Sequence, residues 1–310
     1  MSPRARRAVR VVGSVALLAA VVVLLPAGSL RAALAQASPL VLGIALAIFL
    51  VCHLAAAFKW RMLMGPSADL TYRSAVRAHF SGLVGNLSPL GMIGGDLVRA
   101  GVAINGSAQP STIMLTSVVD RIVDSIALVV LAMIGFLWIG GRSTAALIVL
   151  GGGTAVSGVG VGVLLLGQSV LRRTHDVRLA GIRDALEMLT AQPGLVARAL
   201  LLSILVQASL ITANAYIGAS VGVESSFGAW LLTWPAAKFA GYLPIGVAGI
   251  GVRETALIAL LRPFGGAPGA VMAAGLLWDA VIIAGAIGGW LMVCILPHWR
   301  LTMLRRIQTP

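Results

Sequence analysis

Apolar runs of membrane-spanning length recur from one end of this 310-residue chain to the other, and they constrain its fold more than any other feature. A helix of about 20 apolar residues crosses a hydrocarbon core of about 30 Å. Hydrophobic residues make up 59% of the chain and charged residues only 11%, far from the composition of a soluble domain. The sequence therefore predicts an all-α, polytopic integral membrane helix bundle with about six full spans in a single transmembrane domain, residues 1–310. The predicted spans are Val9–Leu25, Leu40–Phe58, Ile113–Ile139, Thr144–Leu166, Leu195–Gly218 and Ala270–Leu296.

The basic residues predict how these spans are oriented. The formal charge is +13, and the arginines gather at the ends of the apolar runs, which favours contacts with anionic lipid headgroups over nucleic acid. The positive-inside rule then places both termini on the cytoplasmic side of the cell membrane. In the segment at about 168–194, Ile182, Leu186 and Leu189 follow one another at helical spacing, which predicts an amphipathic helix on the cytoplasmic surface.

Two interpretations of the first apolar run stay open. It is either a retained span or part of a signal peptide that is cleaved near Ala33-Leu34-Ala35. The retained span is favoured, because Pro26 and Arg31 separate the run from that site.

Two segments must start and finish on the same side of the membrane if this orientation is right. They are Tyr72–Ser111, on the cytoplasmic side, and Glu224–Pro268, on the outer side. Each contains Pro-x-Gly-x-x-Gly followed by an arginine, beginning at Pro89 and at Pro244. Proline stops a helix and glycine permits an irregular turn, so each segment is predicted to be a re-entrant, broken-helix hairpin. Because the hairpins open to opposite sides, they predict an inverted repeat with halves at about 72–139 and 224–296.

Charged residues also occur inside the apolar runs, where each ionised side chain costs several kcal/mol. Asp120, Arg121 and Asp124 lie within one span; the two aspartates share a helix face, and Arg121 is within reach of Asp124. Asp279 follows Asp124 by 155 residues, the offset that also separates Pro89 from Pro244. Basic residues around a polar cavity suit a phosphate group. The candidate substrate-binding residues are Asn86, Pro89, Gly94, Gly95, Asp96, Arg99, Asp120, Arg121, Asp124, Lys238, Pro244, Arg253, Glu254 and Asp279.

Simpler interpretations exist for three of these features. Pro89 and Pro244 could each kink a continuous spanning helix. Asp96 could be the N-cap of a half-helix that begins at Leu97. The charged run at 120–124 could be a buried structural ion pair, or it could mark the end of a span near the headgroups.

Three motifs resemble the lysylphosphatidylglycerol synthase/flippase transmembrane family: Asn86-Leu87-Ser88-Pro89 through Gly94-Gly95-Asp96-Leu97-Val98-Arg99, then Asp120-Arg121, then Pro244 to Gly249-Ile250-Gly251-Val252-Arg253-Glu254. This resemblance implies a membrane domain that moves lipids, including aminoacylated phosphatidylglycerol, between leaflets, or that accompanies glycolipid assembly. In the synthases of the family this domain is fused to a soluble aminoacyl transferase. This sequence stops at Pro310, so aminoacyl transfer is not expected.

The sequence favours a lipid flippase or transporter over an enzyme. The phosphate of an anionic or lipid-linked substrate would meet Arg99, Arg121 and Arg253, and the nearby carboxylates would order these arginines or meet a cationic headgroup. The alternatives are a membrane-embedded transferase acting on a lipid phosphate and a non-catalytic partner of a cell-envelope lipid or glycan synthase. Expected partners are anionic membrane lipids, a second copy of the chain or an envelope-biosynthesis protein. Neither the two cysteines nor the four histidines are grouped along the sequence, so no catalytic residue, metal or cofactor is predicted.

Overall fold

Helices are the regular secondary structure of the computed structural model, which describes residues 35–65, 70–88, 91–104, 110–140, 191–241 and 251–295 and scattered residues between 151 and 190. No β-strand occurs among these residues, which confirms the all-α prediction. The predicted span Val9–Leu25, most of Thr144–Leu166 and of the segment at 168–194, and both termini lie outside the described residues. The elements are α3 (Pro39–Leu63), α4 (Tyr72–Asn86), α5 (Gly91–Ile104), α6 (Pro110–Trp138), α9 (Pro193–Ser220), α10 (Phe227–Ala240), α11 (Val252–Leu261), the short 3₁₀ helix η3 (Arg262–Phe264) and α12 (Pro268–Ile295).

Four long helices, α3, α6, α9 and α12, are long and apolar enough to cross a membrane. They coincide with four of the six predicted spans. Each begins at a proline, which suits the first helical position because its φ is already helical and its missing N–H needs no partner there. Large apolar side chains lie exposed on their outer faces, as lipid contact requires. Examples are Leu40, Val51, Leu137, Leu201 and Ile287.

The other helices form two pairs, α4 with α5 and α10 with α11. The longest of them, α4, has 15 residues and is about 22 Å long, too short for a hydrocarbon core of about 30 Å. Within the first pair the chain reverses: a Cβ at Gly82 would lie 2.9 Å from the Cβ of Arg99, and one at Gly85 would lie 3.0 Å from the Cα of Gly95. In the second pair, a Cβ at Gly241 would lie 3.6 Å from the Cβ of Arg253, and at the far ends of the two helices a Cβ at Gly265 would lie 2.8 Å from the Glu224 carbonyl oxygen. Both pairs are therefore antiparallel.

The predicted breaks are present, since helices end at Asn86 and Ala240 and new ones begin at Gly91 and Val252. Neither segment is one continuous kinked helix, although Pro89 and Pro244 themselves lie outside the described residues.

The two second helices begin in different ways. The prediction that Asp96 caps a half-helix starting at Leu97 is wrong, because α5 already begins at Gly91, where φ is +54°. Helix α11 starts immediately after Gly251, where φ is +86°, a conformation that a residue with a Cβ rarely adopts. The Glu254 carboxylate accepts the N–H of Gly251 at 2.6 Å and so satisfies one of the free donors at that helix start.

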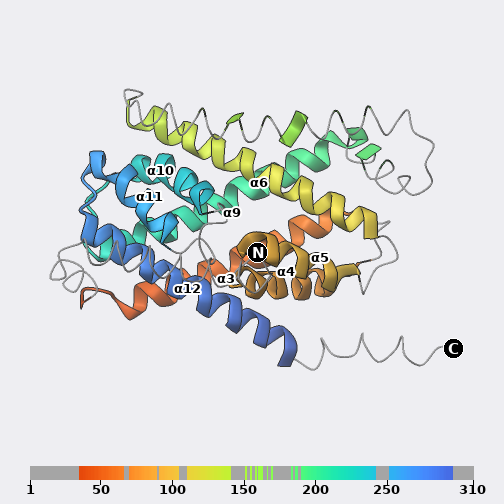
Figure 1. Cartoon of the computed structure of the whole chain (residues 1–310), viewed down its shortest axis with the longest axis horizontal. Helices are drawn as coiled ribbons and strands as arrows, with labels where there is room; N and C mark the ends of the chain where they lie inside the picture. The colour runs from red at the N-terminus through yellow and green to blue at the C-terminus, as the bar shows by residue number, and fades with distance from the viewer. Residues whose placement is uncertain are drawn as a thin grey trace, which may run out of the picture.

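Helix α3 is central to the packing, since it contacts α4, α6, α9 and α12. Figure 1 shows α10 and α11 at the left of the molecule and α4 and α5 right of centre, with α6 and α12 running past them. The largest hydrophobic cluster is built from α3, α9, α10, α11 and α12 and contains three tryptophans, Trp230, Trp234 and Trp278. The two short pairs are thus held within a frame of long helices.

Alanine substitutions at two glycines of α5 distinguish the effect of close packing on stability from the effect of helix propensity. A Cβ at Gly95 would collide with the side chain of Asn86 and the carbonyl of Gly82, whereas a Cβ at Gly101 would meet nothing within 4 Å. We expect Gly95→Ala to destabilise the protein by about 1–3 kcal/mol through overpacking. The matched Gly101→Ala should be neutral or stabilising by up to about 1 kcal/mol. Thermal unfolding in detergent measures both, and equal effects would contradict close packing at Gly95.

Candidate functional site

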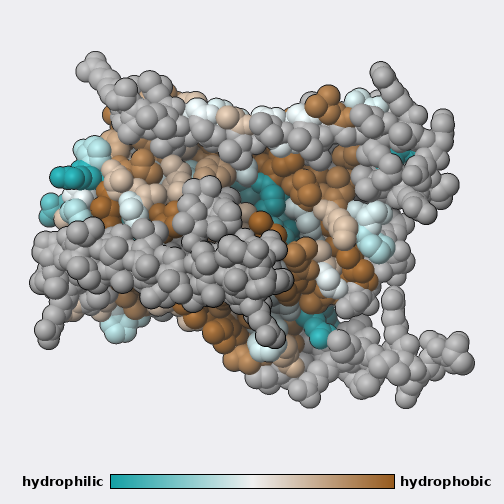
Figure 2. Space-filling model, viewed as in Figure 1, coloured by the Kyte–Doolittle hydropathy of each residue, from teal (hydrophilic) through white to brown (hydrophobic). Residues whose placement is uncertain are grey.

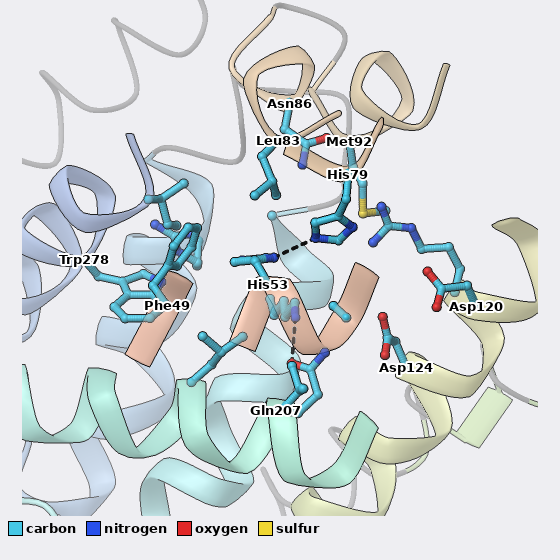
Figure 3. Close-up of a pocket in the computed structure, with 18 of the residues that line it drawn as sticks. Phe49, His53, His79, Leu83, Asn86, Met92, Asp120, Asp124, Gln207 and Trp278 are labelled. Carbon is cyan, nitrogen blue, oxygen red and sulfur yellow. Dashed lines mark hydrogen bonds between the residues drawn. The ribbon is translucent and has the colours of Figure 1, made fainter. Parts of the chain in front are cut away.

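A cavity of about 210 Å³ lies between the long helices and the two short pairs. Its wall combines apolar and aromatic side chains with ionisable ones (Figure 3). Figure 2 shows hydrophilic surface recessed between hydrophobic surfaces on one face of the molecule. The charged lining residues are Arg99, Asp120, Arg121, Asp124, Lys238 and Arg253, and the apolar ones include Phe49, Leu83, Val206, Leu210, Trp234 and Trp278.

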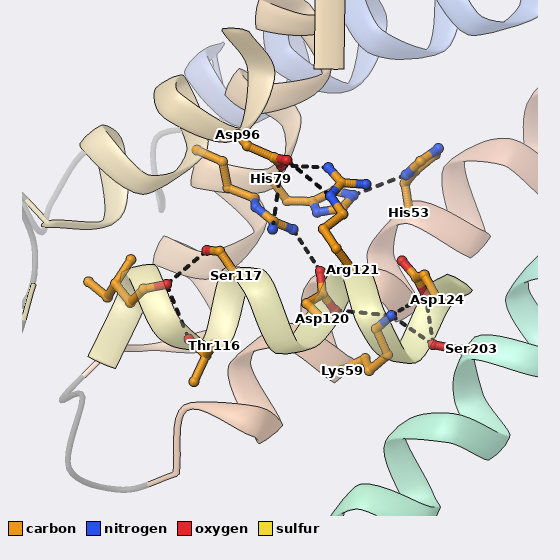
Figure 4. Close-up of polar contacts among 12 residues, drawn as sticks. His53, Lys59, His79, Asp96, Thr116, Ser117, Asp120, Arg121, Asp124 and Ser203 are labelled. Atoms are coloured by element: carbon orange, nitrogen blue, oxygen red, sulfur yellow. Dashed lines mark hydrogen bonds and ion pairs between the residues drawn. The ribbon is translucent and has the colours of Figure 1, made fainter. Parts of the chain in front are cut away.

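Lys59 is the centre of the first group of charges. It is only 1% exposed, and its ammonium lies 3.0 Å from Asp120 and in direct contact with Asp124 (Figure 4). The hydroxyl of Ser203, from α9, lies 2.7 Å from the Lys59 Nζ and donates to Asp124 at 2.7 Å. The two aspartates share a helix face, as their spacing of four residues predicts. Lys59 therefore links α3, α6 and α9.

Arg99 extends this group to α5. Its guanidinium donates to Asp120 at 2.9 Å, lies 3.5 Å from Asp96 and stacks over Trp60, with 4.5 Å to the ring centroid. Arg121 donates to Asp96 through Nε at 3.0 Å and through Nη2 at 2.5 Å. Arg121, which the sequence placed within reach of Asp124, thus makes two hydrogen bonds to Asp96 on α5. Lys59 reaches Asp124 from α3, and Arg121 turns to the carboxylate of another helix, where it makes two parallel hydrogen bonds.

The second group of charges lies on α10, α11 and α12. Arg253 donates to Glu254 at 3.0 Å, contacts Asp279 and lies 5.6 Å from the ring centroid of Trp234. Lys238 donates to the side-chain amide oxygen of Gln207, on α9, at 2.8 Å. This group thus repeats the first in outline, with an arginine on a second short helix paired to an aspartate on the following long helix.

Together the two groups form a charged cluster of five cations and five carboxylates, so it is neutral as a whole. Such balance is what a low-dielectric environment requires, because a single unpaired ion there is costly. Lys238 differs from the other four cations. Each of those lies within 4 Å of a carboxylate, whereas the hydrogen bond that Lys238 makes in the described structure goes to a neutral amide. The cluster comprises Lys59, Arg99, Arg121, Lys238 and Arg253 with Asp96, Asp120, Asp124, Glu254 and Asp279.

The candidate residues predicted from sequence fall into four sets. Asp96, Glu254 and Asp279 are not part of the cavity lining but form ion pairs with the lining residues Arg121 and Arg253. Gly94 and Gly95 are buried in α5, outside the cavity lining, and Gly95 serves the packing of α4 on α5. Pro89 and Pro244 lie outside the described residues. The candidates that line the cavity are Asn86, Arg99, Asp120, Arg121, Asp124, Lys238 and Arg253.

Several polar residues of the site were not predicted. Lys59 follows the predicted span Leu40–Phe58, yet α3 continues to Leu63 and buries it. His53 and His79, apparently scattered, lie 3.0 Å apart between Nδ1 and Nε2. Gln207 also lines the cavity. The available signal was a polar residue inside an apolar run, which holds for His53 and Gln207.

Removing Lys59 tests how far the fold depends on the cluster. We expect Lys59→Met to destabilise the protein by about 3–5 kcal/mol, because it leaves Asp120 and Asp124 uncompensated in a buried position. A second change, Asp124→Asn, should restore part of the loss. The control is Arg61→Met on the same helix, where the Arg61 guanidinium donates to the Gly65 carbonyl at 2.8 Å and contacts neither aspartate of the Lys59 group. Unfolding midpoints in detergent measure the series, and equal midpoints for both methionine variants would refute the structural role.

The comparison with known proteins agrees with this picture of a membrane domain. None of the curated proteins matches the chain. A family model described as the lysylphosphatidylglycerol synthase TM region matches residues 10–289, which contain all ten members of the charged cluster. The motifs that carry the resemblance in the sequence also fall within this range. The chain therefore belongs to the lysylphosphatidylglycerol synthase transmembrane-region family.

Proposed function

We propose that the protein is a transporter that moves a phosphate-bearing lipid between the leaflets of the cell membrane. The observation that carries this proposal is a cavity with charged walls enclosed by helices whose outer faces are apolar. In such a site the headgroup is bound by polar side chains while the acyl chains stay in the surrounding lipid. Charged side chains at membrane depth are generally found where a polar substrate passes. The family to which the chain belongs has a membrane lipid in its description, which supports a lipid substrate.

The size of the cavity supports a headgroup as its occupant. Its volume of about 210 Å³ is below the roughly 300–1,000 Å³ of pockets that enclose a whole drug-sized ligand. A glycerophosphate headgroup fits such a volume, but two acyl chains do not. Phosphatidylglycerol and its aminoacylated form are the substrates we favour, since the Lys and Arg side chains suit the phosphate and Asp124 suits an added ammonium.

The order of the helices supports an inverted repeat with two re-entrant hairpins. A long helix, two short ones and a long one occur twice, as α3 to α6 and as α9 to α12. In each set an arginine on the second short helix binds an aspartate on the long helix and stacks on a tryptophan (Arg99 with Asp120 and Trp60; Arg253 with Asp279 and Trp234).

Charge parity in the sequence gives the two sets opposite orientations, with both termini cytoplasmic. In transporters, inverted repeats with broken helices surround a substrate site near the midplane and rock about it to expose it to either side.

Lys238 is the cation that we assign to the headgroup phosphate. Its bond goes to an uncharged amide, so an incoming phosphate does not have to compete with a bound carboxylate. Arg99 and Arg253, which the sequence also suggested as phosphate ligands, are each held by two carboxylates. Their positive charges are already balanced by these carboxylates, so they stabilise the structure of the cavity wall more than they attract a phosphate.

Purified protein in phosphatidylcholine liposomes tests the transport itself. A fluorescent phosphatidylglycerol and its lysyl ester are added as probes, and loss of outer-leaflet fluorescence to a membrane-impermeant quencher reports exchange between leaflets. We expect exchange that depends on the protein. Chemical turnover of the lipid without exchange would overturn the transporter and support the transferase.

The same assay tests Lys238. We expect Lys238→Gln to lower the rate of exchange roughly tenfold or more, which corresponds to the loss of one hydrogen bond to a charged group, about 1.5–3 kcal/mol. The matched control is Arg198→Gln, which removes one positive charge from the exposed part of α9. Equal rates for the two variants would contradict the assignment of Lys238 to the phosphate.

A further inference from the structure

The cavity contains a pair of hydrogen-bonded histidines that the charged cluster does not use. We propose that His53 and His79 form a proton-binding site that takes up a proton when an anionic headgroup enters, which couples lipid movement to proton movement. This inference rests on the proposed transport of a phosphate-bearing lipid and adds the coupling ion. Nothing in the sequence motifs points to it, because His53 is on α3 and His79 is on α4.

The geometry of the pair is that of a shared proton. The His53 Nδ1 lies 3.0 Å from the His79 Nε2, and both rings line the cavity (Figure 3). His79 is 8% exposed, and its other ring nitrogen, Nδ1, is buried without a hydrogen-bond partner among the described residues. A buried polar atom without a partner costs free energy. The His79 Nδ1 is therefore available to a polar atom of a ligand in the cavity.

The number of hydrogens on the two imidazole rings indicates which kind of ligand atom suits the His79 Nδ1. Two neutral imidazoles hold two N–H groups on four ring nitrogens, and one of these hydrogens lies between His53 and His79. One of the two outer nitrogens is then a bare acceptor. One additional proton makes both outer nitrogens donors, His79 Nδ1–H and His53 Nε2–H. A phosphate oxygen accepts from such donors, so the protonated pair suits an anion better than the neutral pair does.

The surrounding charges set when this proton is favoured. Lys238, Asp124 and Arg121 act electrostatically on His53. Arg99, Arg121 and Lys59 act on His79. The groups facing the pair thus come from α3, α5, α6 and α10. They are mostly cations, which disfavour an added proton on the pair until an anion enters the cavity. Asp120 and Arg253 also line the cavity, while α9 and α12 present the uncharged Gln207 and Trp278.

Electroneutrality links the proton to the lipid. The charged cluster holds five cations and five carboxylates, so the empty cavity is neutral when the histidine pair is neutral. A bound phosphodiester adds one negative charge, and one proton on the pair restores neutrality. At low dielectric this compensation is favoured, because a nearby opposite charge stabilises the protonated form. The phosphodiester and the proton therefore each bind more favourably when the other is present.

Calorimetry tests the coupling directly. The probe is dihexanoylphosphatidylglycerol, whose phosphodiester does not titrate near neutral pH, added to the protein in phosphatidylcholine nanodiscs. Binding enthalpies in two buffers of different ionisation enthalpy give the number of protons taken up per probe bound. We expect uptake approaching one proton, and an affinity that falls as pH rises by up to tenfold per unit.

The variants separate the pair from other titrating groups. His53→Gln/His79→Gln should bind the probe with no proton uptake and with an affinity that no longer varies with pH. The control is His175→Gln/His298→Gln, which changes the other two histidines of the chain and should leave proton uptake unchanged.

Binding by the wild type without proton uptake, or uptake that persists in the His53/His79 variant, would overturn the proton site while leaving the transporter intact. Absence of probe binding by the wild type would overturn both. If the His53/His79 double variant does not fold, His79→Gln alone decides, because it removes the buried Nδ1 and should lower the proton uptake while the wild-type uptake persists in His175→Gln/His298→Gln.

Discussion

The contact of Lys59 with Asp120 and Asp124 is the interaction on which the rest of the structure depends. A lysine that is 1% exposed in an apolar helix is stable only if carboxylates meet it, and both of these come from one face of α6. Ser203 adds α9 to the same contact. Since Asp120 also binds Arg99, the chain of ion pairs continues to α5. The short pair α4 and α5 is thereby fixed to three long helices by polar contacts as well as by packing.

The four short helices bring polar backbone groups into the bundle, and the charged side chains lie in the same region. Helices α4, α5, α10 and α11 are too short to cross a hydrocarbon core, so in a membrane their polar backbone ends must lie against protein or water. Asn86 and Gly241, at two of these ends, line the cavity, and so do Arg99 of α5 and Arg253 of α11. The breaks in the helices and the charged cluster are therefore parts of one arrangement. Each would be unfavourable in a membrane without the other.

The sequence predicts the long helices well and the pairing of side chains poorly. Apolar length is a local property, so α3, α6, α9 and α12 follow from counting residues, and proline and glycine mark the breaks. Partners across helices depend on tertiary packing, which no local pattern contains. The sequence placed Arg121 within reach of Asp124 on its own helix, but no local pattern points to Asp96 on α5, to which it donates. His53 and His79 are 26 positions apart, and only the packing of α3 on α4 brings them into contact.

The neutrality of the charged cluster gives Lys238 a second effect beyond a direct contact with a phosphate. Five carboxylates are balanced by five cations, and Lys238 is the member whose bond goes to a neutral amide. Its charge contributes little to holding a particular carboxylate in place. It contributes instead to the overall potential of the cavity, which without it would be negative and would repel an anion. A cation that is dispensable for local pairing but required for balance is suited to exchange partners with a passing headgroup.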